Sequence, residues 1–258
     1  MQAVDGLEPS SYLVNLAKKN IEGEITQKEV QTLLNDYYSK RDLSRIDKRR
    51  TREADFVSLR ISEIIFTGIF RLSKETLYVI HQYLFNDIYS HAGKIRQYNI
   101  SKAEWVLDGA SVQSLDYKFI DSAIQYDLNL EKQCNYKNKT NEEIIEHWAT
   151  FISNLWQIHP FEEGNTRTVA VFFLKYLRKL GFDVTNNMFA KHSWYFRNSL
   201  VIATYYDYDF FDKEIFLKKF LRNLILGEDN NLKNREMHIS KLLYQDDKKV
   251  EIEEEVKI

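Results

Sequence analysis

Ten consecutive residues in the middle of the chain, HPFEEGNTRT (159–168), combine the side-chain types that phosphate chemistry requires. Histidine normally titrates near neutrality, so His159 suits a general base. Glu163 offers Mg²⁺ a hard oxygen ligand, and Arg167 can donate charge-assisted hydrogen bonds to phosphate oxygens. Gly164 lets the backbone approach an anion closely. The stretch thus holds a base, a metal ligand, an anion cradle and a cation, which phosphoryl or nucleotidyl transfer needs.

Two helices are expected to position this stretch. Upstream, the residues from Asn141, the expected N-cap, to Trp156 carry a broad apolar face that is typical of a central buried helix. Downstream, apolar residues between Val169 and Leu180 recur three and four positions apart, and Gly181 fits the position after the last turn. The stretch therefore precedes a helix N-terminus, where free N–H groups and the helix dipole attract anions.

The rest of the chain also has mainly helical patterns. Only two of its 258 residues are proline and eight are glycine, which is too few for a many-turned β fold. The segment 94–107 is the exception, because its length and composition predict a short β-hairpin with a turn near Tyr98–Asn99 or Lys102–Ala103. Helical spacing covers 10–39 as two short helices, 56–70, 74–89, 115–135, 192–206 and 212–226.

The two ends of the chain are expected to differ from its middle. Thr26 is a plausible N-cap for the second short helix, with Glu29 as its capping-box partner. The strongly charged segment 39–53 is expected to be a connector or an exposed helix. These patterns divide the chain into a helical element (1–45), a main domain (46–227) and a polar, acid-rich tail (228–258) that is expected to be partly disordered.

Composition narrows the class of protein. The net charge of −2 provides no bulk basic field for binding nucleic acid or an anionic membrane. Cys134 is the single cysteine, which excludes an internal disulfide framework and a cysteine-rich metal site. No stretch reaches the length of a membrane span, and the N-terminus has no signal-peptide pattern. We therefore expect a soluble, cytoplasmic protein, with delivery elsewhere as an effector left open.

The central stretch resembles the signature of the Fic family, H-x-F-x-[D/E]-G-N-G-R-x-x-R, which lies between two central helices. Two positions depart from it, because Thr166 replaces the second glycine and Ala170 the final arginine. The resemblance includes LFNDIYSHAGKIRQYNISK (84–102), which is similar to the family's flap region, and covers about residues 56–226. It implies an all-α, mainly helical fold with a short β-hairpin flap. The residues that fit the signature are His159, Phe161, Glu163, Gly164, Asn165 and Arg167.

The resemblance implies transfer of AMP from ATP to a Ser, Thr or Tyr hydroxyl of a target protein, or of the chain itself. By this carry-over, His159 accepts the hydroxyl proton and Glu163 coordinates Mg²⁺, while Phe161 anchors the loop in the core. The flap, with Lys102 and Trp105 as guesses for the contact, would align the target as an added strand. The implied nucleotide-binding residues are Gly164, Asn165 and Thr166 at the α-phosphate and Arg167 at the outer phosphates.

The first thirty residues resemble small antitoxins that supply an inhibitory [S/T]-x-x-x-E-[G/N] motif to some Fic toxins. Met1 then takes the Ser/Thr position, and Asp5 and Gly6 take the final pair. Two other placements match less well, since Glu22–Gly23 has a lysine at the Ser/Thr position and Ser58 places a serine at the Glu position. We therefore prefer Asp5.

Both partners of the inhibitory pair are altered in this chain. Asp5 is one methylene shorter than glutamate, and Ala170 replaces the arginine with which the inhibitory glutamate pairs. A charge-assisted hydrogen bond contributes about 1.5–3 kcal/mol, so its loss weakens the inhibition. We expect the N-terminal element to remain as a structural cap with weak or different autoinhibition.

Other functions remain open. A Fic-fold enzyme could carry UMP, GMP or phosphate, or remove AMP, and a non-enzymatic nucleotide-binding or toxin–antitoxin module is a third reading. The sequence Glu163-Gly164-Asn165 disfavours the phosphate-transferring branch, and the retained His159 disfavours a decayed loop. The expected partners are ATP, a target protein with an exposed hydroxyl and a second copy of the chain in a homodimer; nucleic acid and membranes are not expected partners.

Overall fold

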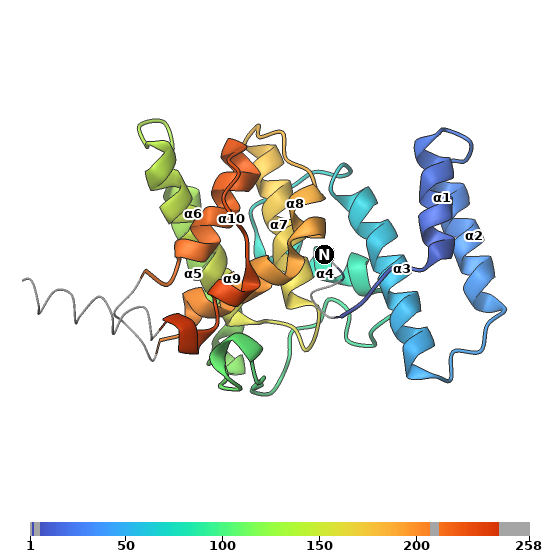
Figure 1. Cartoon of the computed structure of the whole chain (residues 1–258), viewed down its shortest axis with the longest axis horizontal. Helices are drawn as coiled ribbons and strands as arrows, with labels where there is room; N and C mark the ends of the chain where they lie inside the picture. The colour runs from blue at the N-terminus through green and yellow to red at the C-terminus, as the bar shows by residue number, and fades with distance from the viewer. Residues whose placement is uncertain (1, 3–5, 207–211, 243–258) are drawn as a thin grey trace, which may run out of the picture.

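The computed structural model describes residues 2, 6–206 and 212–242, and within them the fold is helical (Figure 1). A helical pair near the N-terminus lies at one end of the molecule, and the larger bundle forms the rest. The helices are α1 (Ser11–Ile21), α2 (Gln27–Ser39), α3 (Ile46–Ile64), α4 (Lys74–Phe85), α5 (Ile120–Gln133), α6 (Asn141–Ile158), α7 (Asn165–Lys179), α8 (Asn187–Lys191), α9 (Ser193–Thr204) and α10 (Ile215–Leu226).

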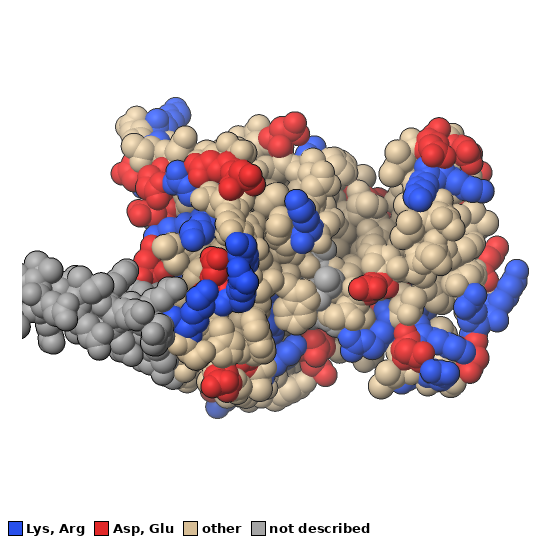
Figure 2. Space-filling model, in the orientation of Figure 1, with Lys and Arg blue, Asp and Glu red and all other residues tan. Residues whose placement is uncertain are grey.

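The expected all-α fold is therefore confirmed, with 3₁₀ turns at η2 (Trp105–Leu107), η3 (Tyr117–Phe119) and η4 (Asn234–Glu236). No described helix combines the length and the apolar character needed to cross a bilayer. Basic and acidic side chains are interspersed over the face in Figure 2, without a broad patch of one sign.

The centre of the bundle is α7, in which every residue from Asn165 to Leu177 is buried. Helix α4 packs on one side of α7 and α6 on another, while α9 and α10 pack against α6. Because α6 and α7 are held on several sides, the loop between them, residues 159–164, has both of its ends fixed in the core.

The N-terminal pair is attached to α3 through a second, smaller core. Apolar side chains of α1 and α2 pack there with Phe56 and Leu59 of α3. The buried carboxylate of Asp55 accepts hydrogen bonds from the Ser10 backbone N–H at 2.6 Å and from the Tyr38 hydroxyl at 2.7 Å. A buried charge needs such partners, so α1 and α2 complete the outer face of α3.

Local signals for helix starts and ends are largely confirmed. Thr26 and Glu29 form the predicted capping box of α2, and Gly181 follows α7 with a φ of +97°. The predicted cap at Asn141 is wrong by one residue. Thr140 caps α6 instead, because its hydroxyl accepts from the Glu143 N–H while the Glu143 carboxylate accepts from the Thr140 N–H.

The predicted β-hairpin over 94–107, the flap segment, is not found in the structure. The pairing that this region makes among the described residues is one antiparallel bridge between Ala103 and Ser111, around the 3₁₀ turn η2. The Arg96 backbone N–H donates to the Pro160 carbonyl at 2.9 Å instead of to a neighbouring strand, and the Glu104 side chain pairs with Arg197 of α9. The loss of helical spacing over residues 94–107 correctly indicated that this segment is not an α-helix. It did not indicate that the segment lacks regular strands.

The tail predicted to begin at 228 continues to pack on the bundle as far as the described chain extends. Met237, Ile239 and Leu242 are buried in the main core. Polar residues separate these apolar ones, so the composition of 228–258 as a whole did not indicate that part of the segment is buried. Residues 243–258 lie outside the described residues.

Candidate active site

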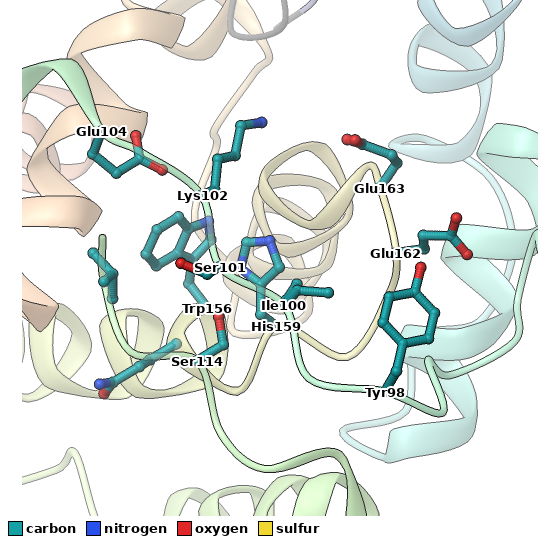
Figure 3. Close-up of a pocket in the computed structure, with 12 residues that line it drawn as sticks. Tyr98, Ile100, Ser101, Lys102, Glu104, Ser114, Trp156, His159, Glu162 and Glu163 are labelled. Atoms are coloured by element: carbon teal, nitrogen blue, oxygen red, sulfur yellow. The ribbon is translucent and has the colours of Figure 1, made fainter. Parts of the chain in front are cut away.

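His159 lies at the junction between α6 and the following loop, facing a cavity of about 410 Å³ (Figure 3). It ends α6 in the left-handed conformation, with a φ of +50°, and its ring stands edge-on to Trp156 at 5.3 Å between centroids. Lys102, Glu104 and Glu163 line the same cavity. The fold thus brings a histidine, a lysine and carboxylates from separate segments together.

The loop is closed by hydrogen bonds between its own residues. The Asn165 side chain is buried, with its Oδ1 accepting from the Phe161 N–H at 2.9 Å and its Nδ2 donating to the Phe161 carbonyl at 2.7 Å. Phe161 is itself buried, as its predicted anchoring role requires. Since both ends of the Asn165 amide serve the loop, a bound anion would meet backbone N–H groups at the start of α7.

Gly164 must be glycine for two separate reasons. Its φ is +79°, a conformation that residues with a side chain rarely adopt. A Cβ atom here would also lie 2.5 Å from the Phe85 ring of α4. The loop can therefore turn into α7 only while it rests directly on α4.

Thr166 has a defined contact in the core. The buried indole Nε1–H of Trp156 donates a hydrogen bond to the Thr166 hydroxyl at 2.9 Å. A glycine at position 166 would leave this indole N–H without that acceptor, which is costly in a core. The departure from the family pattern thus ties α6 to the first turn of α7.

Arg96 organises the loop, although no sequence pattern marks it as part of the site. Its guanidinium, which is almost completely buried, donates to the carbonyls of His159 at 2.8 Å and Ile158 at 3.3 Å. It also donates to the carbonyls of Tyr98 at 2.7 Å and Leu115 at 2.5 Å. One side chain thus joins the end of α6 to Tyr98 in the flap segment and to Leu115 beyond it, and so positions His159.

His81 of α4 supports the loop from the opposite side. Its Nδ1 accepts from the Gly93 N–H at 2.8 Å, so its Nε2 carries the proton and donates to the Glu163 carbonyl at 2.9 Å. The ring stacks on Phe161, with 3.7 Å between centroids. Both contacts hold the loop backbone and leave the Glu163 carboxylate exposed to the cavity.

Arg167, predicted to hold outer phosphates, is buried among protein partners. Its Nη1 lies 2.8 Å from the Glu53 carboxylate of α3 and 3.1 Å from the Gln2 side-chain oxygen, and its Nη2 donates to the Tyr89 hydroxyl at 3.1 Å. The Tyr89 hydroxyl in turn donates to Glu53 at 2.6 Å. A carboxylate of the chain therefore already neutralises this guanidinium.

Glu53 escaped the sequence analysis because it ends the charged segment that was expected to be a connector or an exposed helix. It precedes the buried Val57 by one helical turn, which puts it on the inward face of α3. The proposed inhibitory Asp5 lies outside the described residues. Its neighbour Gly6 accepts a hydrogen bond at its carbonyl from Arg50 of α3 at 3.3 Å.

A second cavity of about 560 Å³ adjoins the first, and both are lined by Lys102, Glu104 and Glu163. It also contains Arg167 and the exposed ring of Trp105. The buried carboxylate of Glu104 forms a bidentate pair with Arg197 of α9, at 2.6 and 2.7 Å. This pair fixes the flap segment against the bundle at the border of the two cavities.

The donor set around Glu163 decides which kind of metal site the fold can offer. The described residues contain no group of three histidine, cysteine or carboxylate side chains that could enclose an ion. Glu163 is exposed at the junction of both cavities. A single carboxylate fits Mg²⁺ bound mainly through phosphate and water oxygens, and does not fit a cage made of protein ligands.

The environment of His159 keeps its imidazole neutral. Burial lowers the pKa of His159 to about 3, and the positive charges of Arg96, Lys102 and Arg197 act in the same direction. Burial likewise lowers the pKa of His81 to about 4. Both rings are therefore uncharged near neutral pH, as a base and a loop support must be.

These pKa values predict a pH-dependent stability. In the unfolded chain both histidines titrate near 6.5, so below that pH the unfolded state binds more protons than the native state. The stabilisation is fully present above pH 6.5 and falls as the pH drops toward 4. Urea unfolding should therefore show a larger loss between pH 7 and pH 5 for the wild type than for His159→Ala, by on the order of 1–2 kcal/mol. Equal losses in both proteins would contradict the lowered pKa of His159.

Comparison with known proteins bears on the same region. Residues 71–177 match the Fic/DOC family model. A 145-residue stretch is 26% identical to Protein adenylyltransferase VbhT of Bartonella schoenbuchensis, which amounts to 56% of this chain and 28% of that protein. The match therefore spans little more than a quarter of the relative's length.

Two solved structures share the fold. BepC of Bartonella tribocorum, a VirB-translocated effector crystallised with bound AMPPNP, covers 70% of this chain and 88% of its own, with a TM-score of 0.56 and 18% identity. The N-terminal FIC domain of Bep8 from Bartonella sp. 1-1C covers 72% and 88%, with a TM-score of 0.58 and 16% identity. The segment that matches the Fic/DOC family model, residues 71–177, contains α4, α5, α6 and most of α7, and so includes His159 and the loop that it begins.

Proposed function

We propose that this protein transfers AMP from ATP to a hydroxyl group of a target protein. The observation that carries the proposal is the placement of His159, which faces a cavity beside the N-terminus of α7 with Glu163 on the same cavity wall. The relative named as a protein adenylyltransferase and the AMPPNP-bound structural neighbour support it.

The chemistry follows from this arrangement. His159 takes the proton of the target hydroxyl, whose oxygen then attacks the α-phosphorus of ATP. The bond between the α-phosphorus and the bridging oxygen breaks, and pyrophosphate leaves with that oxygen. The backbone N–H groups in the first turn of α7 stabilise the charge on the α-phosphate. The proton then passes from His159 to solvent, which restores the base.

Glu163 is the residue that would hold Mg²⁺, which neutralises phosphate oxygens when it is bound. Arg167 retains its predicted role at the outer phosphates, but it must first exchange Glu53 or Gln2 for the nucleotide. The side chain of Asn165 serves the loop instead of the phosphate.

The proposed weak autoinhibition can be tested without large deletions. Removing residues 1–45 would uncover the apolar face of α3 and leave Asp55 without Ser10 and Tyr38. A change in activity could then come from lost stability as well as from lost inhibition. A point substitution of Gln2, which contacts Arg167 directly, avoids this difficulty.

We expect Gln2→Ala to raise the affinity for ATP by less than about tenfold, because one hydrogen bond contributes a net 0.5–1.5 kcal/mol. Titration calorimetry measures the affinity, and the exposed Gln31 on α2 supplies the matched control, Gln31→Ala. An increase of a hundredfold or more would show strong inhibition by the N-terminal segment and contradict the proposal.

The proposed cargo is tested by competition. The full chain with Mg²⁺ and ATP labelled at the α-phosphate should label itself or a protein in a host-cell lysate. Unlabelled ATP in excess should abolish that label, while GTP, UTP and CTP should leave most of it. Displacement by another nucleotide in preference to ATP would assign a different cargo to the same fold.

A further inference from the structure

Lys102 lies at the border of the two cavities. It belongs to the flap segment and lines both the cavity that contains His159 and the one that contains Arg167. Figure 3 shows its side chain extending between Glu104 and Glu163. Its backbone N–H donates to the Ser111 hydroxyl, which fixes the position from which the side chain extends.

The other cations of the second cavity are committed to partners within the protein. Arg167 is paired with Glu53, Arg197 forms the bidentate pair with Glu104, and Arg50 donates to the Gly6 carbonyl. Over the part of the chain that the structure describes, the Lys102 ammonium makes no hydrogen bond or ion pair and is exposed. Among the described residues that line the two cavities, Lys102 is thus the cation that can accept an anion without giving up a contact.

The carboxylates that line the cavities would repel a polyphosphate, so its binding requires a cation with no partner of its own. Once the internal pairs are set aside, Glu163 is a negative charge that both cavities share, and Glu162 adds another to the first cavity. Position 170 contributes nothing, because Ala170 is buried in the core. A polyphosphate entering between them would meet the N-terminus of α7 and Lys102 as its uncommitted positive partners.

We propose that Lys102 is a phosphate-binding residue, which holds the β- and γ-phosphates of the nucleotide. This inference rests on the proposed function for the identity of the ligand, a nucleoside triphosphate. It gives Lys102 a different role from target docking, which the family resemblance implied.

Phosphate binding and target docking by Lys102 predict different experimental results. A phosphate-binding lysine affects nucleotide affinity in the absence of target, and its effect grows with the number of phosphates. A docking lysine changes the KM for the target protein and leaves nucleotide affinity unaltered. Because Lys102 is exposed, Lys102→Ala should fold normally.

The experiment is titration calorimetry of the full chain with adenosine, AMP and an ATP analogue whose α–β bridge is a methylene, which prevents turnover. For Lys102→Ala we expect the affinity for the triphosphate to fall about ten- to a hundredfold, as for a lost charge-assisted hydrogen bond. Affinity for AMP should fall much less, and affinity for adenosine should be unchanged. Lys102→Arg should retain most of the triphosphate affinity, because it keeps the charge.

Lys137→Ala is the matched control, since Lys137 is exposed and precedes α6 at the end opposite His159, about 27 Å along the helix. Equal triphosphate affinity in Lys102→Ala and the wild type would overturn the role of Lys102 and leave AMP transfer intact. A lowered affinity in Lys102→Ala with no transfer of AMP by the wild type would refute the proposed function alone. A wild type that binds no triphosphate would refute both.

Discussion

Replacing His159 by alanine should lower the rate of AMP transfer by about 10²–10⁴-fold, the contribution typical of a positioned general base. The neutral imidazole faces the cavity in which the attacking hydroxyl must lie, and its lowered pKa keeps it able to accept a proton. Nucleotide affinity should stay within about threefold of the wild type, since the proposed phosphate contacts come from other groups. Single-turnover kinetics with labelled ATP measures the rate, and calorimetry measures the affinity.

His238→Ala provides the control for this substitution. His238 stands edge-on to the exposed ring of Trp105 and does not line the cavity of His159. We expect its rate to remain close to that of the wild type. A His159→Ala protein that transfers AMP at the wild-type rate would exclude His159 as the base.

Replacing Arg96 by alanine should cost about 3–5 kcal/mol in the free energy of unfolding, the largest loss we expect from a single change at the site. The guanidinium donates to four backbone carbonyls, including those of His159 and Ile158, and is 3% exposed. The Ile158 carbonyl would be left buried without this donor, at a cost of about 1–3 kcal/mol, and the three part-buried carbonyls would lose charge-assisted hydrogen bonds that water replaces in part. Urea unfolding measures the loss.

Two further variants identify the cause of that loss. Arg96→Lys retains the charge but cannot reach four carbonyls, so it should recover only a minor part of the stability. Arg71→Ala removes an exposed arginine and should change stability by less than about 0.5 kcal/mol. A loss below about 1 kcal/mol in Arg96→Ala would show that the loop does not depend on Arg96.

The parts of the fold that depend on local signals could be predicted from the sequence. The capping box of α2 and the glycine after α7 lie within a few residues of the helix ends that they define. The same reasoning missed the start of α6 by one residue, because Thr140 and Asn141 are both good caps. The predicted hairpin is not confirmed, because the backbone N–H of Arg96 bonds to Pro160 and the side chain of Glu104 to Arg197, both elsewhere in the fold.

The candidate site also has a part that the sequence predicts and a part that it does not. The loop residues are contiguous, so spacing alone placed His159 and Glu163 together before the fold was known. Their supports come from other elements: His81 lies 82 residues from Glu163 in the sequence, and Arg96 lies 63 residues from His159. No local pattern marks such contacts. Glu53 was concealed further by the charged segment that it ends.

The most direct test of the account compares ATP labelled at the α-phosphate with ATP labelled at the γ-phosphate. The full chain is incubated with Mg²⁺ and either nucleotide, with host-cell lysate as a source of target proteins and His159→Ala as the control. We predict label on protein from the α-position alone, and its loss in the control. Label on protein from the γ-position alone, or α-label that persists in His159→Ala, would contradict AMP transfer at this site.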